Sequence, residues 1–90
     1  MILGRVTGAL HATLANQHLE GQHLLLVDPV EPSGKLSGKP LVCIDRVGAG
    51  PGDLVLVNRE GGAARALLQD DRSPVQALIV GVVDHMQVKE

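Results

Sequence analysis

The segment Val47–Val57, VGAGPGDLVLV, places three glycines and a proline before an apolar run, which is typical of loops that bind phosphate. A P-loop needs a lysine and a hydroxyl residue directly after its last glycine, because these side chains bind the phosphates and Mg²⁺. Here Asp53 follows Gly52, so a carboxylate lies where phosphate requires a cation. A dinucleotide-binding turn would need glycine at position 53 and then a helix, whereas LVLV favours a strand. The pattern therefore predicts a tight turn between two strands.

Cysteine and histidine offer little further chemistry. Cys43 is the single cysteine and lies in the apolar run LVCI, with only Arg46 nearby to lower the pKa of its thiol. We interpret it as a buried structural thiol. The four histidines lack the spacing of a metal site, and if they bind a metal, we expect the site between subunits. They are His11, His18, His23 and His85.

The acidic residues also lack a catalytic arrangement. Asp45, Asp53 and Asp84 lie at the ends of predicted strands, and no pair of carboxylates is placed for acid–base catalysis. The sequence therefore predicts a protein that is not an enzyme and that uses no cofactor or metal.

Arg65 is placed unusually, because it begins AARALLQ (63–69), the one segment dense in helix-forming residues. A cation in the first turn of a helix opposes the helix dipole. Two explanations remain open. Arg65 has an acidic partner, such as a carboxylate on a neighbouring chain, or it is a solvated arginine.

Composition limits the kind of protein to which these residues belong. Ninety residues make one small domain, and apolar residues form 44% of it without any Phe, Tyr or Trp. A core of small aliphatic side chains is marginal at this size, so self-association would add stability. A net charge of −2 and the missing aromatic residues argue against nucleic acid as a partner.

The same composition predicts the location of the protein. A single cysteine favours the reducing cytoplasm, and the N-terminus lacks the features of a signal peptide. No apolar run approaches the ~20 residues that span a bilayer. We therefore expect a cytoplasmic protein without a membrane partner.

Apolar patterning predicts the elements that hold the candidate residues. Alternating or continuous apolar runs predict five strands, over 2–14, 23–30, 41–47, 53–59 and 75–84. An exposed loop over 31–39 and one short helix over 63–69 complete the prediction. Gly4 and Gly8 in the first strand suggest bends or close backbone approach.

The predicted fold class is mainly β. Five short strands with one short helix indicate a small OB-like β-barrel, and an SH3-like barrel is the nearest alternative. We expect one domain over residues 1–85 and a C-terminal tail over 86–90.

Five sequence segments occur in one order along nearly the whole chain. They are VTGALHAT (6–13), LEGQHLLLVDPV (19–30), IDRVGAGPGDLVLV (44–57), GGAAR (61–65) and PVQALIVGVVD (74–84). Together they resemble the bacterial microcompartment vertex proteins of the EutN/CcmL family. The resemblance implies an OB-like barrel that forms a cyclic homopentamer at the vertices of a polyhedral shell, whose facets are hexamers of a different fold. A flat hexagonal sheet closes only if it includes fivefold positions, so the implied role is geometric.

The resemblance also directs attention to assembly. We predict that Gly48, Ala49, Gly50 and Gly52 form a loop that contacts neighbouring subunits or shell hexamers, since glycine lets backbones approach closely. Arg65 and Asp84 are further interface candidates. The alternative function is an OB-type module that binds single-stranded nucleic acid or a small ligand.

Overall fold

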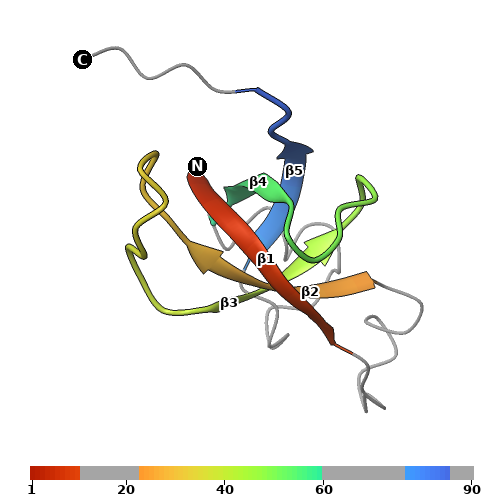
Figure 1. Cartoon of the computed structure of the whole chain (residues 1–90). Coiled ribbons are helices and arrows are strands. Elements are labelled where there is room, and N and C mark those ends of the chain that lie inside the picture. Colours follow the sequence, from red (N-terminus) through yellow and green to blue (C-terminus); the bar gives the residue numbers. More distant parts are fainter. Residues whose placement is uncertain (11–22, 60–76, 86–90) are drawn as a thin grey trace.

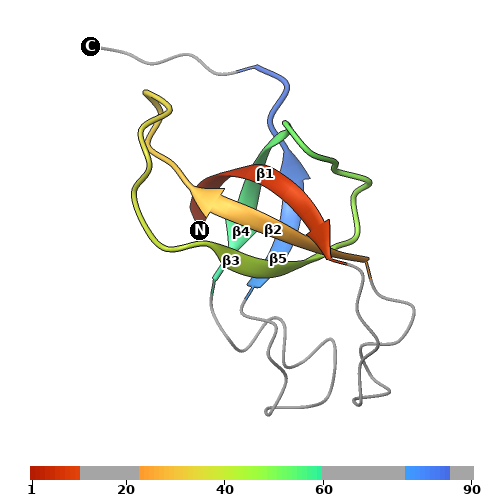
Figure 2. The ribbon, with the colours of Figure 1, turned by 60° about the horizontal axis from the view of Figure 1, so that its bottom comes forward.

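The protein forms a closed five-stranded barrel. The computed structural model describes residues 1–10, 23–59 and 77–85. The strands are β1 (Ile2–Leu10), β2 (His23–Pro29), β3 (Leu41–Asp45), β4 (Leu54–Asn58) and β5 (Ala77–Val82). They close in the order β1-β2-β3-β5-β4 (Figures 1 and 2).

The strand pairing supports the OB-like arrangement over the SH3-like alternative. Strands β3 and β5 pair in parallel, whereas the other pairings are antiparallel. The predicted mainly β fold class is thereby confirmed. The predicted helix (63–69) and the predicted tail (86–90) lie outside the described residues.

Small aliphatic side chains fill the barrel. The buried core cluster consists of Val6, Leu25, Val27, Leu41, Cys43, Val55, Val57, Ala77 and Ile79. Full burial of one Val, Leu or Ile side chain stabilises a fold by about 1.5–3 kcal/mol. Ala49 packs against the cluster from the loop after β3, so this loop is anchored to the core.

Strand β1 contains an irregularity that the alternating pattern did not predict. Val6 pairs with Val27 and Gly8 pairs with Leu26, so Thr7 is an extra residue on β1. Such a β-bulge disrupts the alternation of faces. Strict alternation would place Leu10, four residues after the buried Val6, on the same face, but beyond the bulge Leu10 is 38% exposed.

Gly4 has the role predicted for a strand glycine, because β2 passes close to it. A Cβ atom at Gly4 would overlap Cγ1 of Val27 and lie 3.3 Å from the carbonyl oxygen of Asp28. Gly8 differs, since a Cβ there would meet no atom within 4 Å. Close packing within the described residues therefore explains Gly4 but not Gly8.

Residues 31–40 are exposed, in agreement with the exposed loop predicted over 31–39, but the segment forms a hairpin where it leaves the barrel. Val30 and Leu36 form an antiparallel bridge, and the amide of Glu31 donates to the carbonyl of Lys35 at 2.8 Å. Both views place this hairpin on the opposite side of the barrel from the loop between β3 and β4 (Figures 1 and 2).

Candidate assembly site

The predicted assembly residues lie in the connection between β3 and β4, residues 46–53, called the glycine loop below. Strand β3 ends at Asp45, two residues earlier than predicted, because the side chain of Asp45 turns the chain. Its Oδ1 atom accepts hydrogen bonds from the amides of Val47 at 3.0 Å and Ala49 at 3.3 Å. Asp45 is only 7% exposed, so this carboxylate is part of the structure of the loop.

A second carboxylate closes the other half of the glycine loop. The amide of Gly50 donates to Oδ2 of Asp53 at 2.9 Å, and the amide of Asp53 donates to the carbonyl of Gly50 at 3.0 Å. The residue that excluded a P-loop in the sequence therefore holds the turn together.

Strand β1 fastens the loop to the barrel. The amide of Gly52 donates to the carbonyl of Val6 at 2.8 Å, and the amide of Val6 donates to the carbonyl of Asp53 at 2.9 Å. Arg5 adds a side-chain bond, from Nη1 to the carbonyl of Gly52 at 3.0 Å. The sequence did not predict Arg5 and Val6 as part of the site, because they lie more than 40 positions before Gly52 and Asp53.

Backbone conformation requires glycine at two of the three glycine positions of the loop. Gly48 has φ of 80° and Gly52 has φ of 92°, a region that residues with a Cβ rarely adopt. The φ of Gly50 is not positive, and a Cβ at this position would meet no atom within 4 Å. The described part of the chain therefore gives no reason for glycine at position 50.

The hydrogen bonds of the loop exclude a phosphate cradle. An anion site of this kind needs backbone N–H groups that point together at the ligand. Here the amides of five loop residues already donate to groups of the protein itself. They are Val47, Ala49, Gly50, Gly52 and Asp53.

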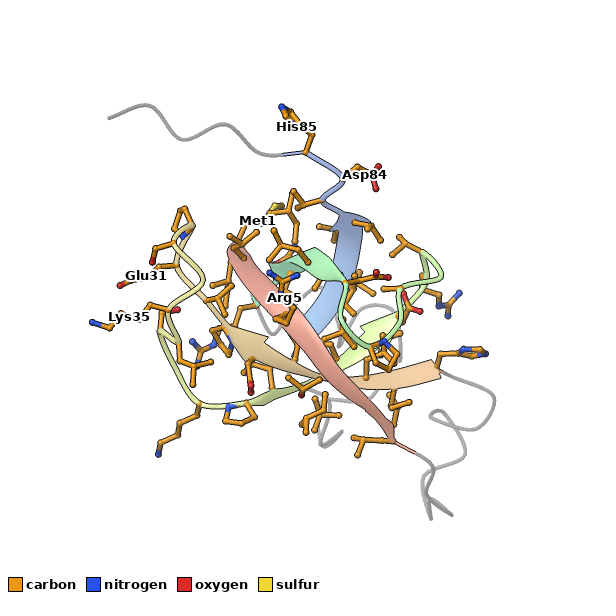
Figure 3. All side chains as sticks on the ribbon, viewed as in Figure 1. Met1, Arg5, Glu31, Lys35, Asp84 and His85 are labelled. Atoms are coloured by element: carbon orange, nitrogen blue, oxygen red, sulfur yellow. The ribbon has the colours of Figure 1, made fainter. Side chains whose placement is uncertain are left out.

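Asp84 lies near the glycine loop in the fold. It is exposed and follows β5, beyond the end of the strand (Figure 3). Its neighbour Val83 donates its amide to the carbonyl of Leu54 at 2.8 Å, and Leu54 directly follows the loop. The structure thus places Asp84 at the same end of β4 as the loop, whereas Arg65 lies outside the described residues.

Cys43 has the features of a structural thiol. It is completely buried, and this burial raises the pKa of the thiol from 9.0 to about 12. The reactive thiolate is therefore not formed at neutral pH.

Metal ligands do not gather in the described ranges. There, no group of three or more His, Cys, Asp or Glu side chains could hold a metal ion. His23 and His85, the two histidines within these ranges, are both exposed. The same ranges contain no helix long and apolar enough to cross a membrane.

The fold and the site define a small OB-like β-barrel protein whose most distinctive feature is an internally bonded loop rather than a catalytic cluster. The family described as "Ethanolamine utilisation protein EutN/carboxysome" matches residues 1–84, and the chain belongs to this family. The resemblance seen in the sequence is thereby confirmed.

Curated relatives match over nearly their full length. The chain is 36% identical over 86 residues to the bacterial microcompartment shell vertex protein EutN of Escherichia coli, covering 96% of this chain and 90% of the relative. It is 40% identical over 88 residues to the shell vertex protein PduN of Salmonella typhimurium, covering 93% and 96%. It is 37% identical over 91 residues to the carboxysome shell vertex protein CcmL of Nostoc, covering 100% and 89%.

Solved structures of the family have the same barrel. The GrpN pentameric microcompartment shell protein from Rhodospirillum rubrum superposes with a TM-score of 0.81 at 35% identity, covering 99% of this chain and 100% of that chain. CcmL of Nostoc superposes with a TM-score of 0.81 at 38% identity, covering 99% and 93%. The family consists of structural shell proteins and not of enzymes.

Proposed function

We propose that this protein forms homopentamers that cap the vertices of a polyhedral bacterial microcompartment shell. The observation that carries the proposal is the full-length match to a pentameric shell protein, at a TM-score of 0.81 with 100% of that chain covered. The proposed location is the microcompartment shell, within the bacterial cytoplasm.

Geometry explains why such a shell needs a separate protein at its vertices. The family resemblance implies flat facets of hexameric shell proteins, and such a sheet closes into a polyhedron only where a fivefold unit replaces a sixfold one. We propose hexameric shell proteins as the second partner, contacted through the glycine loop and Asp84 at one end of the barrel. The rigid, internally bonded loop suits a contact that must hold a fixed angle.

Native mass spectrometry tests the pentamer directly. The purified chain is expected to give one species at five times the chain mass of 9.4 kDa. Coexpression with shell hexamers should then give closed polyhedral particles, visible by electron microscopy, and omission of this protein should leave the shells open. A stable monomer that binds a single-stranded DNA oligonucleotide would instead support the OB-type binding module.

No observation favours that second function over the first. Proteins that bind single strands stack bases on aromatic side chains along a positive groove. This chain has no aromatic residue and a net charge of −2.

A further inference from the structure

Arg5 is the one charged residue of β1, and it lies in the middle of that strand (Figure 3). Its side chain is exposed, so it is not part of the aliphatic core. Strand register places it opposite Leu54 of β4, the first residue after the glycine loop. From this position its Nη1 atom donates to the carbonyl of Gly52 at 3.0 Å. An exposed side chain of the barrel wall therefore holds the backbone of the loop.

The second half of the glycine loop is a turn that is bonded within itself. Oδ2 of Asp53 accepts from the amide of Gly50 at 2.9 Å, and the amide of Asp53 donates to the carbonyl of Gly50 at 3.0 Å. Both bonds join residues of the turn to each other. They fix the shape of the turn but leave its orientation relative to the barrel to other contacts.

The contacts of the turn with β1 supply that orientation. The amide of Gly52 donates to the carbonyl of Val6 at 2.8 Å, and the amide of Val6 donates to the carbonyl of Asp53 at 2.9 Å. These two bonds join backbone groups, so they do not depend on the side chain at position 5. The bond from Arg5 is the third, and it requires a donor side chain that reaches Gly52. A change at position 5 can therefore alter how the turn is held without altering the backbone bonds.

Arginine suits this contact. Its guanidinium is planar, always charged and presents its donors in a rigid fork. A hydrogen bond from a charged donor is shorter and stronger than one between neutral groups. Because Arg5 is exposed, water replaces much of this bond when the side chain is removed, and the stability of the barrel changes little. The loss falls on the freedom of the turn to pivot on β1.

We propose that Arg5 is a positioning residue of the vertex: by holding the carbonyl of Gly52, it fixes the angle at which the glycine loop meets a shell hexamer. The inference rests on the proposed function, in which this loop contacts the hexamers, and it adds a residue that lies outside the loop. The same contact recurs at every subunit of the ring. A small pivot of the turn therefore weakens closure of the shell more than it weakens the subunit.

The test coexpresses Arg5→Met with shell hexamers and counts closed particles by electron microscopy. Methionine keeps a long, flexible side chain but has no donor. The variant is expected to keep the five-subunit mass and the wild-type urea midpoint, while closed particles decrease several-fold. Hydrogen-exchange mass spectrometry of the pentamer should show faster exchange in peptides that cover residues 46–54, and unchanged exchange in β2 and β3.

Lys35→Met is the matched control. It removes the same charge from an exposed position on the hairpin, on the opposite side of the barrel from the glycine loop (Figures 1 and 2). This variant should close shells as the wild-type chain does. An equal loss of closed particles in the control would assign the effect to net charge and overturn the role of Arg5.

Three further results would also overturn it. Normal shells with Arg5→Met would show that the bond is not needed for assembly. Lost closure with unchanged exchange in the loop would mean that Arg5 contacts the hexamer directly. An unfolded or dissociated Arg5→Met protein would make Arg5 a residue of the fold. A wild-type chain that is monomeric, or that closes no shells with hexamers, would instead overturn the proposed function itself.

Discussion

Two aspartates determine how the candidate site behaves at the scale of single residues. Asp45 and Asp53 accept the amide hydrogens of Val47, Ala49 and Gly50, so the glycine loop is held by carboxylates rather than by a ligand. Hydrogen bonds to charged groups contribute about 1.5–3 kcal/mol each. A loop stabilised in this way keeps its shape before any partner arrives, which lowers the entropy cost of assembly.

Cys43 gives a testable pH dependence. Burial raises the pKa of its thiol from 9.0 to about 12, so the folded state keeps a proton that the unfolded state loses above pH 9. Its contribution to stability is therefore fully present below pH 9 and is lost as the pH rises toward 12. Linkage predicts a loss of about 1 kcal/mol in the free energy of unfolding between pH 9 and 10.

Urea unfolding of the wild-type chain and of Cys43→Ala, at pH 8, 9 and 10, measures this effect. Cys43→Ala should have a lower free energy of unfolding at pH 8 but a smaller decrease above pH 9. Equal decreases in the two proteins would show that the thiol does not titrate as its burial requires.

At the scale of elements, the glycine loop and the strands are joined by contacts between distant parts of the chain. The loop bonds to Val6 and Arg5 of β1, and its Ala49 packs on the core of the barrel. A change in the loop therefore affects folding only where it alters these contacts or the backbone conformation.

Substitutions of the loop glycines should distinguish effects on the stability of the fold from effects on shell assembly. Gly52→Ala should lower the free energy of unfolding by about 1–2 kcal/mol, because alanine is strained at a φ of 92°. Gly50→Asp should leave the stability of the barrel nearly unchanged, since its φ is not positive and its Cβ position is open. If Gly50 serves assembly, this variant should still reduce shell closure.

Urea unfolding of each variant measures the change in the free energy of unfolding. Electron microscopy of shells coexpressed with the hexamers measures the loss of shell closure. Global unfolding of Gly50→Asp would indicate that the turn itself requires glycine at this position. Normal shells formed with a folded Gly50→Asp protein would remove Gly50 from the assembly surface.

At the scale of the whole molecule, a 90-residue chain with no aromatic residue builds the core of its barrel from Val, Leu, Ile, Ala and Cys43. Part of its apolar surface stays outside, on β4 and β5. Both features favour a protein whose stability comes partly from its neighbours, as expected for an obligate oligomer.

Thermal unfolding should therefore depend on protein concentration. When a pentamer unfolds to five chains, a hundredfold rise in concentration stabilises each chain by about 2 kcal/mol. For a domain of this size, that difference raises Tm by on the order of 10 °C. Differential scanning calorimetry across this range measures the shift. A Tm that is independent of concentration would mean that the subunit is stable without its partners.

The sequence by itself determined the strand content, the aliphatic core and the absence of a phosphate loop. Each of these depends on neighbouring residues: apolar alternation predicts strands, and Asp53 beside Gly52 excludes a P-loop. The resemblance over 1–85 added the family, which the match over 1–84 confirmed.

Tertiary structure alone decided the bulge at Thr7 and the attachment of the glycine loop to Arg5. The reason is physical, because strand register and side-chain environment depend on pairing between residues far apart in the chain. Arg5 and Gly52 are separated by 47 positions, and no local pattern brings them together. Only the closed barrel shows why position 4 requires glycine, since a Cβ there would overlap Val27 of the neighbouring strand.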